Sequence, residues 1–284
     1  YLVSPSGSTS LLNQDADYDR DLFTLTETGT YQLVIDSAYY SYNGYTGTYN
    51  FNLLTPPNTN LAFDTVTTAN LSAQETELYK FTGTAGQRLY FDSQTSTISG
   101  SWSLRGPNNQ TISGASSSLS YDFQTTLPYN GTYVLVVEGS NSTAANFDFQ
   151  IVTPTTTTSA LTLNTPVSGT ISKLGEQDIY TFTGTAGQRL YYDNLKTDTS
   201  DTLRAYLVSP SGTSIFNSEA DNDRDLFTLT ETGTYQLVID SYYNYYTNDT
   251  GTYNFNLLTP PTTNLAFDTV TTANLAAQET ELYK

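Results

Sequence analysis

The sequence predicts an all-β protein made of tandem, jelly-roll-like β-sandwich domains of about 100 residues, and three observations support this prediction. The segment NLAFDTVTTANL begins at Asn60 and again at Asn264, which gives a period of 264 − 60 = 204 residues. The segment FTGTAGQRLY begins at Phe81 and at Phe182, so a shorter period of 182 − 81 = 101 residues lies inside the longer one. Short runs of alternating apolar and polar residues are separated by turn residues, as in half-buried strands.

The two periods divide the chain into four parts. Residues 1–58 are the C-terminal part of one unit and residues 59–157 are a complete but divergent unit. Residues 158–261 are a second complete unit and residues 262–284 begin the next one. We expect the chain to be an internal window on a longer tandem protein. The alternative is that partial units of neighbouring chains complete each other by strand exchange.

In the unit 158–261, the strands are expected in order around explicit turns. The run DIYTFTG is followed by the turn Gly184 to Gly187, and LRAYLV is followed by the turn Pro210 to Gly212. The turn Thr232 to Thr234 leads into TYQLVID, and the unit closes with GTYNFNLL. Alternate residues of the last two runs are apolar, so each should bury one face. About eight such strands in this length favour two packed sheets over one open sheet.

Counting hairpins along this unit predicts which loops share an end of the sandwich. The loop KTDTSD at 196–201 leaves one strand, and two strands later the chain returns with the acidic run EADNDRD at 219–225. Two more strands bring it back at Ser241, where the tyrosine-rich loop begins. All three loops are therefore expected at one end.

Composition excludes several classes of function. Ten Lys and Arg residues stand against 28 Asp and Glu with no histidine, so the formal net charge is −18 and nucleic acid is a poor partner. Cysteine is absent, which excludes disulfides, thiolate metal sites and a cysteine nucleophile. No apolar run has the length of a membrane span. Without His or Cys, and without a GxSxG elbow or a phosphate loop, we expect no enzymatic activity.

The acidic loops predict a calcium site, because Ca²⁺ prefers carboxylate and carbonyl oxygens on loops. The alternative is a solvated acidic loop that protects a sheet edge and keeps the chain soluble. The spacing does not fit an EF-hand, which needs Gly at its sixth and Glu at its twelfth position. The candidate ligands are Asp15, Asp17, Asp19, Asp21, Asp198, Asp201, Glu219, Asp221, Asp223 and Asp225.

Two tyrosine-rich loops predict a contact surface for sugar rings or for a neighbouring protein. The alternative is that half of these rings fold back as lids on the sandwich. The candidate contact residues are Tyr39, Tyr40, Tyr42, Tyr45, Tyr242, Tyr243, Tyr245 and Tyr246.

The motifs DIYTFTGTAGQRLYY at 178–192, LRAYLVSPSG at 203–212 and the paired GTY strands resemble the bacterial pre-peptidase C-terminal domain and its relatives. The resemblance covers most of each unit. It implies a jelly-roll-like sandwich, export from a bacterial cell, and an accessory or surface module that sometimes binds calcium. The divergent unit departs from this pattern, since Glu77 and Leu78 stand where the other unit has Asp178 and Ile179.

These observations together favour a non-enzymatic, extracellular or cell-surface structural array that forms a stalk or fibre stabilised by calcium. Self-association and surface polysaccharide are the expected partners. The alternative function is an accessory binding or adhesion module that tethers a secreted enzyme or a cell to polysaccharide or protein.

Overall fold

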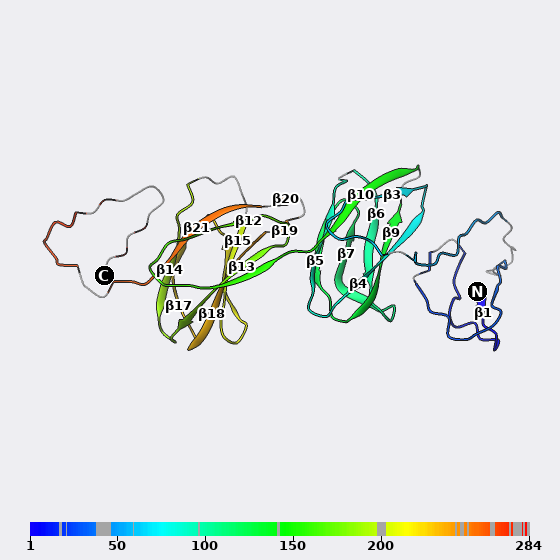
Figure 1. Ribbon diagram of the computed structural model, residues 1–284, viewed down its shortest axis with the longest axis horizontal. Coiled ribbons are helices and arrows are strands. Elements are labelled where there is room, and N and C mark those ends of the chain that lie inside the picture. The colour runs from blue at the N-terminus through cyan, green and yellow to red at the C-terminus, as the bar shows by residue number, and fades with distance from the viewer. Residues whose placement is uncertain are drawn as a thin grey trace, which may run out of the picture.

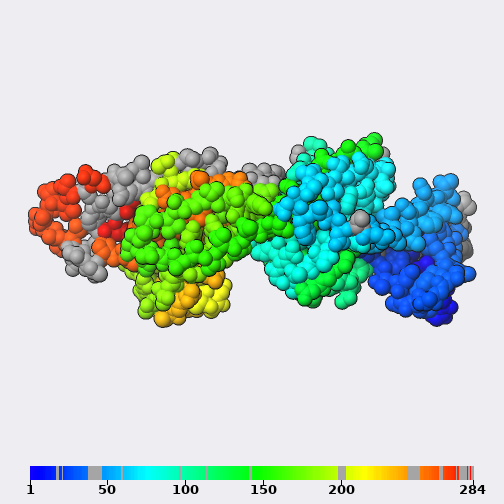
Figure 2. Space-filling view, in the orientation of Figure 1, coloured from blue at the N-terminus to red at the C-terminus, as the bar shows by residue number. Residues whose placement is uncertain are grey.

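The computed structural model describes residues 1–16, 19–20, 22–37, 47–58, 60–95, 97–140, 143–197, 203–241, 243–244, 247–248, 250–261, 265–272, 274, 280 and 282. These residues contain strands and turns and no helix, which confirms the all-β prediction. They accordingly include no helix of the length and apolarity needed to cross a bilayer. The units follow one another along an elongated molecule, with the two sandwiches between the first unit and the C-terminal segment (Figures 1 and 2). We call residues 1–58 the first unit, 59–157 the middle unit, 158–261 the third unit and 262–284 the C-terminal segment.

The middle unit is a sandwich of two four-stranded sheets, in the orders β3-β10-β5-β8 and β4-β9-β6-β7. Its strands are β3 Thr67–Leu71, β4 Thr76–Gly83, β5 Arg88–Ser93, β6 Gly100–Arg105, β7 Thr111–Ser118, β8 Phe123–Thr126, β9 Gly131–Gly139 and β10 Ala145–Val152. The core between the sheets surrounds Trp102, which is completely buried and meets Phe91, Phe123 and Phe147 edge to face. Burial of such large rings supplies most of the stabilisation of a unit this small.

The third unit repeats this sandwich with one additional strand. Its sheets have the orders β12-β21-β14-β17 and β11-β13-β18-β15-β16. The strands are β11 Thr156–Ala160, β12 Val167–Ile171, β13 Gln177–Gly184, β14 Arg189–Asn194, β15 Leu203–Val208, β16 Ser214–Glu219, β17 Arg224–Thr228, β18 Gly233–Ser241 and β21 Gly251–Leu258. A short hairpin, β19 Tyr243–Asn244 and β20 Thr247–Asn248, follows β18. The alternate residues expected to face the core, Tyr235, Leu237 and Ile239 among them, are buried.

Three of the five GTY motifs, at 29–31, 131–133 and 233–235, share one backbone geometry that requires their glycine. The glycines Gly29, Gly131 and Gly233 have φ between 142° and 153°, and a Cβ there would lie 2.7–2.8 Å from the ring of a proline in the facing turn. Two residues later, the tyrosine hydroxyl bonds to the backbone four residues before it, as Tyr235 does with the amide and carbonyl of Glu231. The motif therefore fixes how one turn packs on another.

The first unit is described as only a small part of a sandwich. Its strands β1 Leu2–Val3 and β2 Gln32–Leu33 pair antiparallel, as β15 and β18 do in the third unit. The segment 47–57 has the same sequence as residues 251–261, yet among the described residues 47–54 form no strand. The same sequence therefore forms the strand β21 in the third unit but no strand in the first unit.

The link between the middle and third units is itself part of a sheet. Three residues after β10 ends at Val152, β11 begins and pairs in parallel with β13 from Gln177 to Thr181. The residues of β11 are all exposed, so the strand is held by backbone pairing with β13 and by the hydrogen bonds of its threonines, such as that from Thr157 to Asp178. The Thr-Pro segment 153–158 thus connects the two units and continues into an edge strand of the next sandwich.

Candidate functional site

The acidic loop of the third unit begins at the end of β16 and is held by the strand β14. Asn194, which is 3 % exposed, donates from its side-chain amide to the carbonyls of Asp221 and Lys196, at 2.8 and 3.3 Å. Its backbone amide donates to Asp223 Oδ1 at 2.8 Å. One buried asparagine therefore ties together the entrances of the acidic loop and of the loop that begins at Lys196.

The tyrosine-rich loop leaves the sandwich at the same end. Ser241, the last residue of β18, pairs with Leu203 of β15, and the Leu203 carbonyl accepts a hydrogen bond from the Ala220 amide at 2.7 Å. The entrances of the three loops therefore lie together, as hairpin counting predicts. We call this end of the third unit the loop pole.

Asp223 has a structural role that spacing alone did not reveal. Its Oδ2 accepts from the Tyr191 hydroxyl at 2.9 Å, while its Oδ1 caps the end of β14. In the middle unit, Asp122 accepts from the Tyr90 hydroxyl at 2.6 Å and from the Ser93 amide at 2.7 Å. In both units the tyrosine lies 32 residues before the aspartate, and the residue that donates the backbone amide lies 29 residues before it. The middle unit thus keeps this carboxylate although it lacks the acidic run of the third unit.

The other acidic residues of the loop are less constrained. Glu219 accepts from the Asn222 side chain at 2.8 Å, which orders the turn. The Oδ1 atom of Asp221 is buried and accepts no hydrogen bond from a described residue. Asp225 is exposed. Asp223 already accepts three hydrogen bonds, from the Tyr191 hydroxyl, the Asn194 amide and the Thr280 hydroxyl. Oxygens of Glu219, Asp221 and Asp225 are therefore the ones available to a cation in this loop.

Several candidate ligands and contact residues lie outside the described residues. In the first unit, Asp15 and Asp19 are described and exposed. Tyr243 lies in the short strand β19. Within the described ranges, no three Asp or Glu residues come together in a group that could hold a metal ion. Those outside the described residues are Asp17, Asp21, Asp198, Asp201, Tyr39, Tyr40, Tyr42, Tyr45, Tyr242, Tyr245 and Tyr246.

Burial shapes the ionisation of the tyrosines behind this loop. Desolvation raises the pKa of Tyr191, and its hydrogen bond to Asp223 acts in the same direction. Desolvation likewise raises the pKa of Tyr192, which is completely buried and donates to the Ala220 carbonyl at 2.8 Å. Both hydroxyls remain protonated donors at neutral pH, so they position the loop and cannot act as bases there.

A second polar cluster lies where the middle unit meets the third. Arg88 donates to Thr156 Oγ1 at 3.3 Å and lies close enough to Asp240 for the carboxylate charge to act on it, with Tyr206 beside them. Gln177 donates to both Tyr206 and Asp240, at 3.0 and 3.1 Å. Burial raises the pKa of Asp240 to about 6, against the Gln177 bond and the charge of Arg88, which lower it. We call these residues the junction cluster.

The junction is also packed through its backbone. A Cβ on Gly175 would lie 3.2 Å from Tyr90 Cβ and 3.3 Å from Pro154, so the two units approach closely here. Thr155 donates to Glu176 at 3.1 Å, and the Thr155 carbonyl accepts from the Gln177 amide. This contact is not predictable from the sequence, because Tyr90, Pro154 and Gly175 are far apart along the chain.

Comparison with known proteins finds only low-scoring similarities to solved structures. No family model and no curated protein sequence matches it. Among solved structures, the pre-peptidase C-terminal domain of a collagenase from Bacillus anthracis is 19 % identical, with a TM-score of 0.29, covering 37 % of this chain and 95 % of that domain. The CUB1-EGF-CUB2 fragment of human MASP-1/3 is 6 % identical, with a TM-score of 0.23, covering 68 % of this chain and 99 % of that fragment. At these scores neither likeness carries an argument about function.

Proposed function

We propose that this chain is a non-enzymatic structural array, in which tandem β-sandwiches form an extracellular stalk or fibre. The junction between the middle and third units is the observation that supports this function. At this junction the connecting chain becomes β11, and Gly175 packs on Pro154 and Tyr90. Arg88 of the middle unit also joins residues of the third unit in the junction cluster. A module joined in this way transmits orientation to the next one, which a flexible linker does not do.

The junction can be tested by measuring the distance between the two units. The chain has no cysteine, so Thr126→Cys and Thr228→Cys place unique spin labels at equivalent exposed positions. We expect a narrow distance distribution for the native junction. Replacing residues 155–160 by a Gly-Ser segment of equal length should broaden it. An equally broad distribution in both proteins would refute the rigid array.

Calcium is the proposed stabiliser of the loop pole. The described carboxylates Glu219, Asp221 and Asp225 do not form a three-carboxylate group by themselves, so each would bind the ion together with backbone carbonyl oxygens or with the candidate ligands Asp198 and Asp201. The support for this proposal is the Oδ1 atom of Asp221, which is buried without a hydrogen-bond donor among the described residues of a chain whose formal net charge is −18. Calorimetry of the full chain should show calcium binding at millimolar ion. The variant Glu219→Gln, Asp221→Asn, Asp225→Asn should lose it, whereas Asp148→Asn, remote from the loop, should not. Chelation should soften fibres seen by electron microscopy, and unchanged fibres would contradict the calcium role.

A second candidate function is adhesion through the loop pole. It is favoured by the common exit of three loops, one of them rich in tyrosine, next to Ser241 and Asn194. Aromatic side chains on such a surface suit sugar rings or a protein partner. Polysaccharide should then quench tyrosine fluorescence. If it does not, a protein partner, including another copy of this chain, is the remaining candidate.

A further inference from the structure

The chain enters and leaves each complete sandwich at the same end. In the third unit, Asn164 Oδ1 accepts from the amide and the hydroxyl of Thr259, at 2.8 and 3.1 Å. In the middle unit, the Asp64 carboxylate accepts from the Thr153 amide at 3.1 Å. The amides of Asn164 and Asp64 also donate to a carbonyl of the last strand of their own unit, each at 2.9 Å. We call this connection between the entrance and the exit of a sandwich the terminal stitch.

Behind the stitch, the first strand inside each sandwich is poorly placed to resist tension. The strand β12 lies at the edge of its sheet and pairs only with β21, and β3 likewise pairs only with β10. Both pairs are antiparallel, and the pulled ends of the two strands lie together at the stitch. Tension along the chain therefore separates the paired residues one after another, as in opening a zipper.

The strand β11 alters this geometry in the third unit. It lies between the junction and the stitch and pairs in parallel with β13, from Thr156 opposite Gln177 to Ala160 opposite Thr181. Asn164 can therefore move away from Thr259 only if β11 slides along β13. Sliding loads all the evenly spaced hydrogen bonds of a parallel pair at once, so they resist together.

A buried carboxylate strengthens the hold on β11. Thr157 donates to Asp178, which is 9 % exposed and accepts a second hydrogen bond from the Tyr253 hydroxyl at 2.6 Å. Thr155 donates to Glu176 at 3.1 Å, just before the strand begins. Side chains at two positions thus reinforce the backbone pairing.

The middle unit lacks this strand among its described residues. The segment 55–60 before Leu61 is two residues shorter than the segment 153–160 before Leu161, and its Pro56 and Pro57 have no amide to donate. Residues 55–58 and 60 form no strand, and the Leu61 amide donates to the Lys80 carbonyl at 2.7 Å. Tension on the middle unit therefore reaches its stitch and the β3–β10 pair almost directly.

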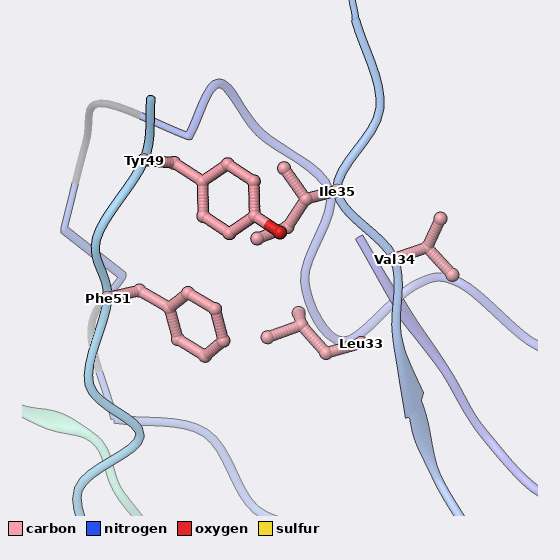
Figure 3. A pocket seen from close by; sticks show the side chains of 5 residues that line it. All are labelled: Leu33, Val34, Ile35, Tyr49 and Phe51. Atoms are coloured by element: carbon pink, nitrogen blue, oxygen red, sulfur yellow. The ribbon is translucent and has the colours of Figure 1, made fainter. Parts of the chain in front are cut away.

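The first unit has no comparable strand pair among its described residues. It is described as only a small part of a sandwich, and its apolar side chains line an open hollow (Figure 3). The mechanical contrast therefore lies between the two complete sandwiches.

We propose that the two kinds of unit differ in their resistance to force, because β11 acts as a shear latch that keeps the third unit closed while the middle unit opens. An array of alternating units then lengthens under tension by opening units of the middle type and keeps those of the third type folded. This inference does not depend on calcium binding, and it would hold for the two sandwiches even if the chain formed no fibre.

The test is to pull the full chain by its two ends at constant force in optical tweezers. The middle unit should open first, and the third unit should open at least about tenfold more slowly, which corresponds to a barrier about 1.4 kcal/mol higher. The two units are nearly equal in length, so disulfides identify them. Thr68→Cys with Asp148→Cys joins facing residues of β3 and β10 and should remove the first event until a reductant is added. The matched pair Ser168→Cys and Asn254→Cys in β12 and β21 should leave the first event unchanged.

A second variant tests the latch itself. Thr157→Pro with Thr158→Pro copies the two prolines of the middle linker, and it should make the third unit open at least about tenfold faster at the same force. Thr158→Ala keeps the backbone pairing and should change nothing. Opening of the third unit first, equal opening rates of the two units in the native chain, or native resistance in the proline variant would each overturn the proposal.

Discussion

The substitution Gly169→Ala is expected to destabilise the third unit of the native chain, but to add little further cost in a chain that already carries Tyr253→Phe. The new Cβ would lie 2.1 Å from the Tyr253 hydroxyl and 2.3 Å from Cζ, far inside normal contact. The ring has little freedom to move away, because its hydroxyl is bonded to Asp178 and to Tyr180, both at 2.6 Å. The middle unit carries the compensated pair, Ala69 opposite Phe147.

The expected magnitudes follow from these contacts. Overpacking of a core costs about 1–3 kcal/mol, and replacing glycine by alanine in a strand returns roughly 0.5–1 kcal/mol, so Gly169→Ala should cost about 1–2 kcal/mol. Tyr253→Phe leaves Asp178 and Tyr180 without a buried partner, which costs about 1–3 kcal/mol. In the double variant the ring is no longer anchored and can shift as in the middle unit. The double variant should therefore be about as stable as Tyr253→Phe alone, a coupling of about 1–2 kcal/mol.

Urea unfolding measures the stability of the two single variants and of the double variant, and the middle unit serves as an internal control. Trp102 is the single tryptophan and belongs to the middle unit, so its fluorescence reports a transition that should not change. Tyrosine circular dichroism reports all the units, so the transition that remains after the one seen by Trp102 fluorescence is accounted for, and that the third-unit substitutions shift, is assigned to the third unit. The reciprocal change in the middle unit, Phe147→Tyr, should be destabilising unless Ala69→Gly accompanies it. Strictly additive costs in both units would refute the steric argument.

Three further predictions concern the junction and the loops. Since the pKa of Asp240 is raised by burial to about 6, the folded state is favoured below pH 4 and loses stability as pH rises through 6. Asp240→Asn should therefore raise the unfolding free energy at pH 7.5 by about 1–3 kcal/mol, and it should change that free energy little at pH 3.5. Asp36→Asn, at the exposed counterpart of Asp240 in the first unit, should have no effect at either pH. Thermal unfolding of both variants measures the difference. Arg88→Ala should raise the Asp240 pKa further, because Arg88 lowers it, and Arg189→Ala should not; an NMR titration that found no difference between them would contradict the junction cluster. Asp122→Ala removes the acceptor of two hydrogen bonds and should destabilise the middle unit by about 2–4 kcal/mol. Urea unfolding followed by Trp102 fluorescence measures this loss, and an unchanged unfolding midpoint would contradict the structural role of Asp122.

Much of the sandwich was predictable because its determinants are local. Alternating residues such as Leu237 and Ile239 are buried as predicted, and turns such as Pro210 to Gly212 lie where their residue types require. Hairpin counting also gave the common end of the three loops, because antiparallel strands reverse direction at each turn. The Asp122 role was missed because its partner Tyr90 is 32 residues away and an isolated aspartate has no distinctive spacing. An equal Tyr-to-Asp separation in the third unit was the one indication in the sequence.

The sequence by itself determined the repeat, the all-β architecture, the acidic charge and the exclusion of thiol and imidazole chemistry, since each depends on composition or on neighbouring residues. Only the tertiary structure decided the environment of identical residues. Phe51 and Phe255 lie in identical stretches of sequence, yet Phe51 is exposed and Phe255 is buried. Burial of such a ring depends on strands from elsewhere in the fold. Arg88 and Arg189 likewise share a motif, but Arg88 meets Asp240 across a junction between units. Contacts between distant segments are set by how sheets pack, which no local pattern encodes.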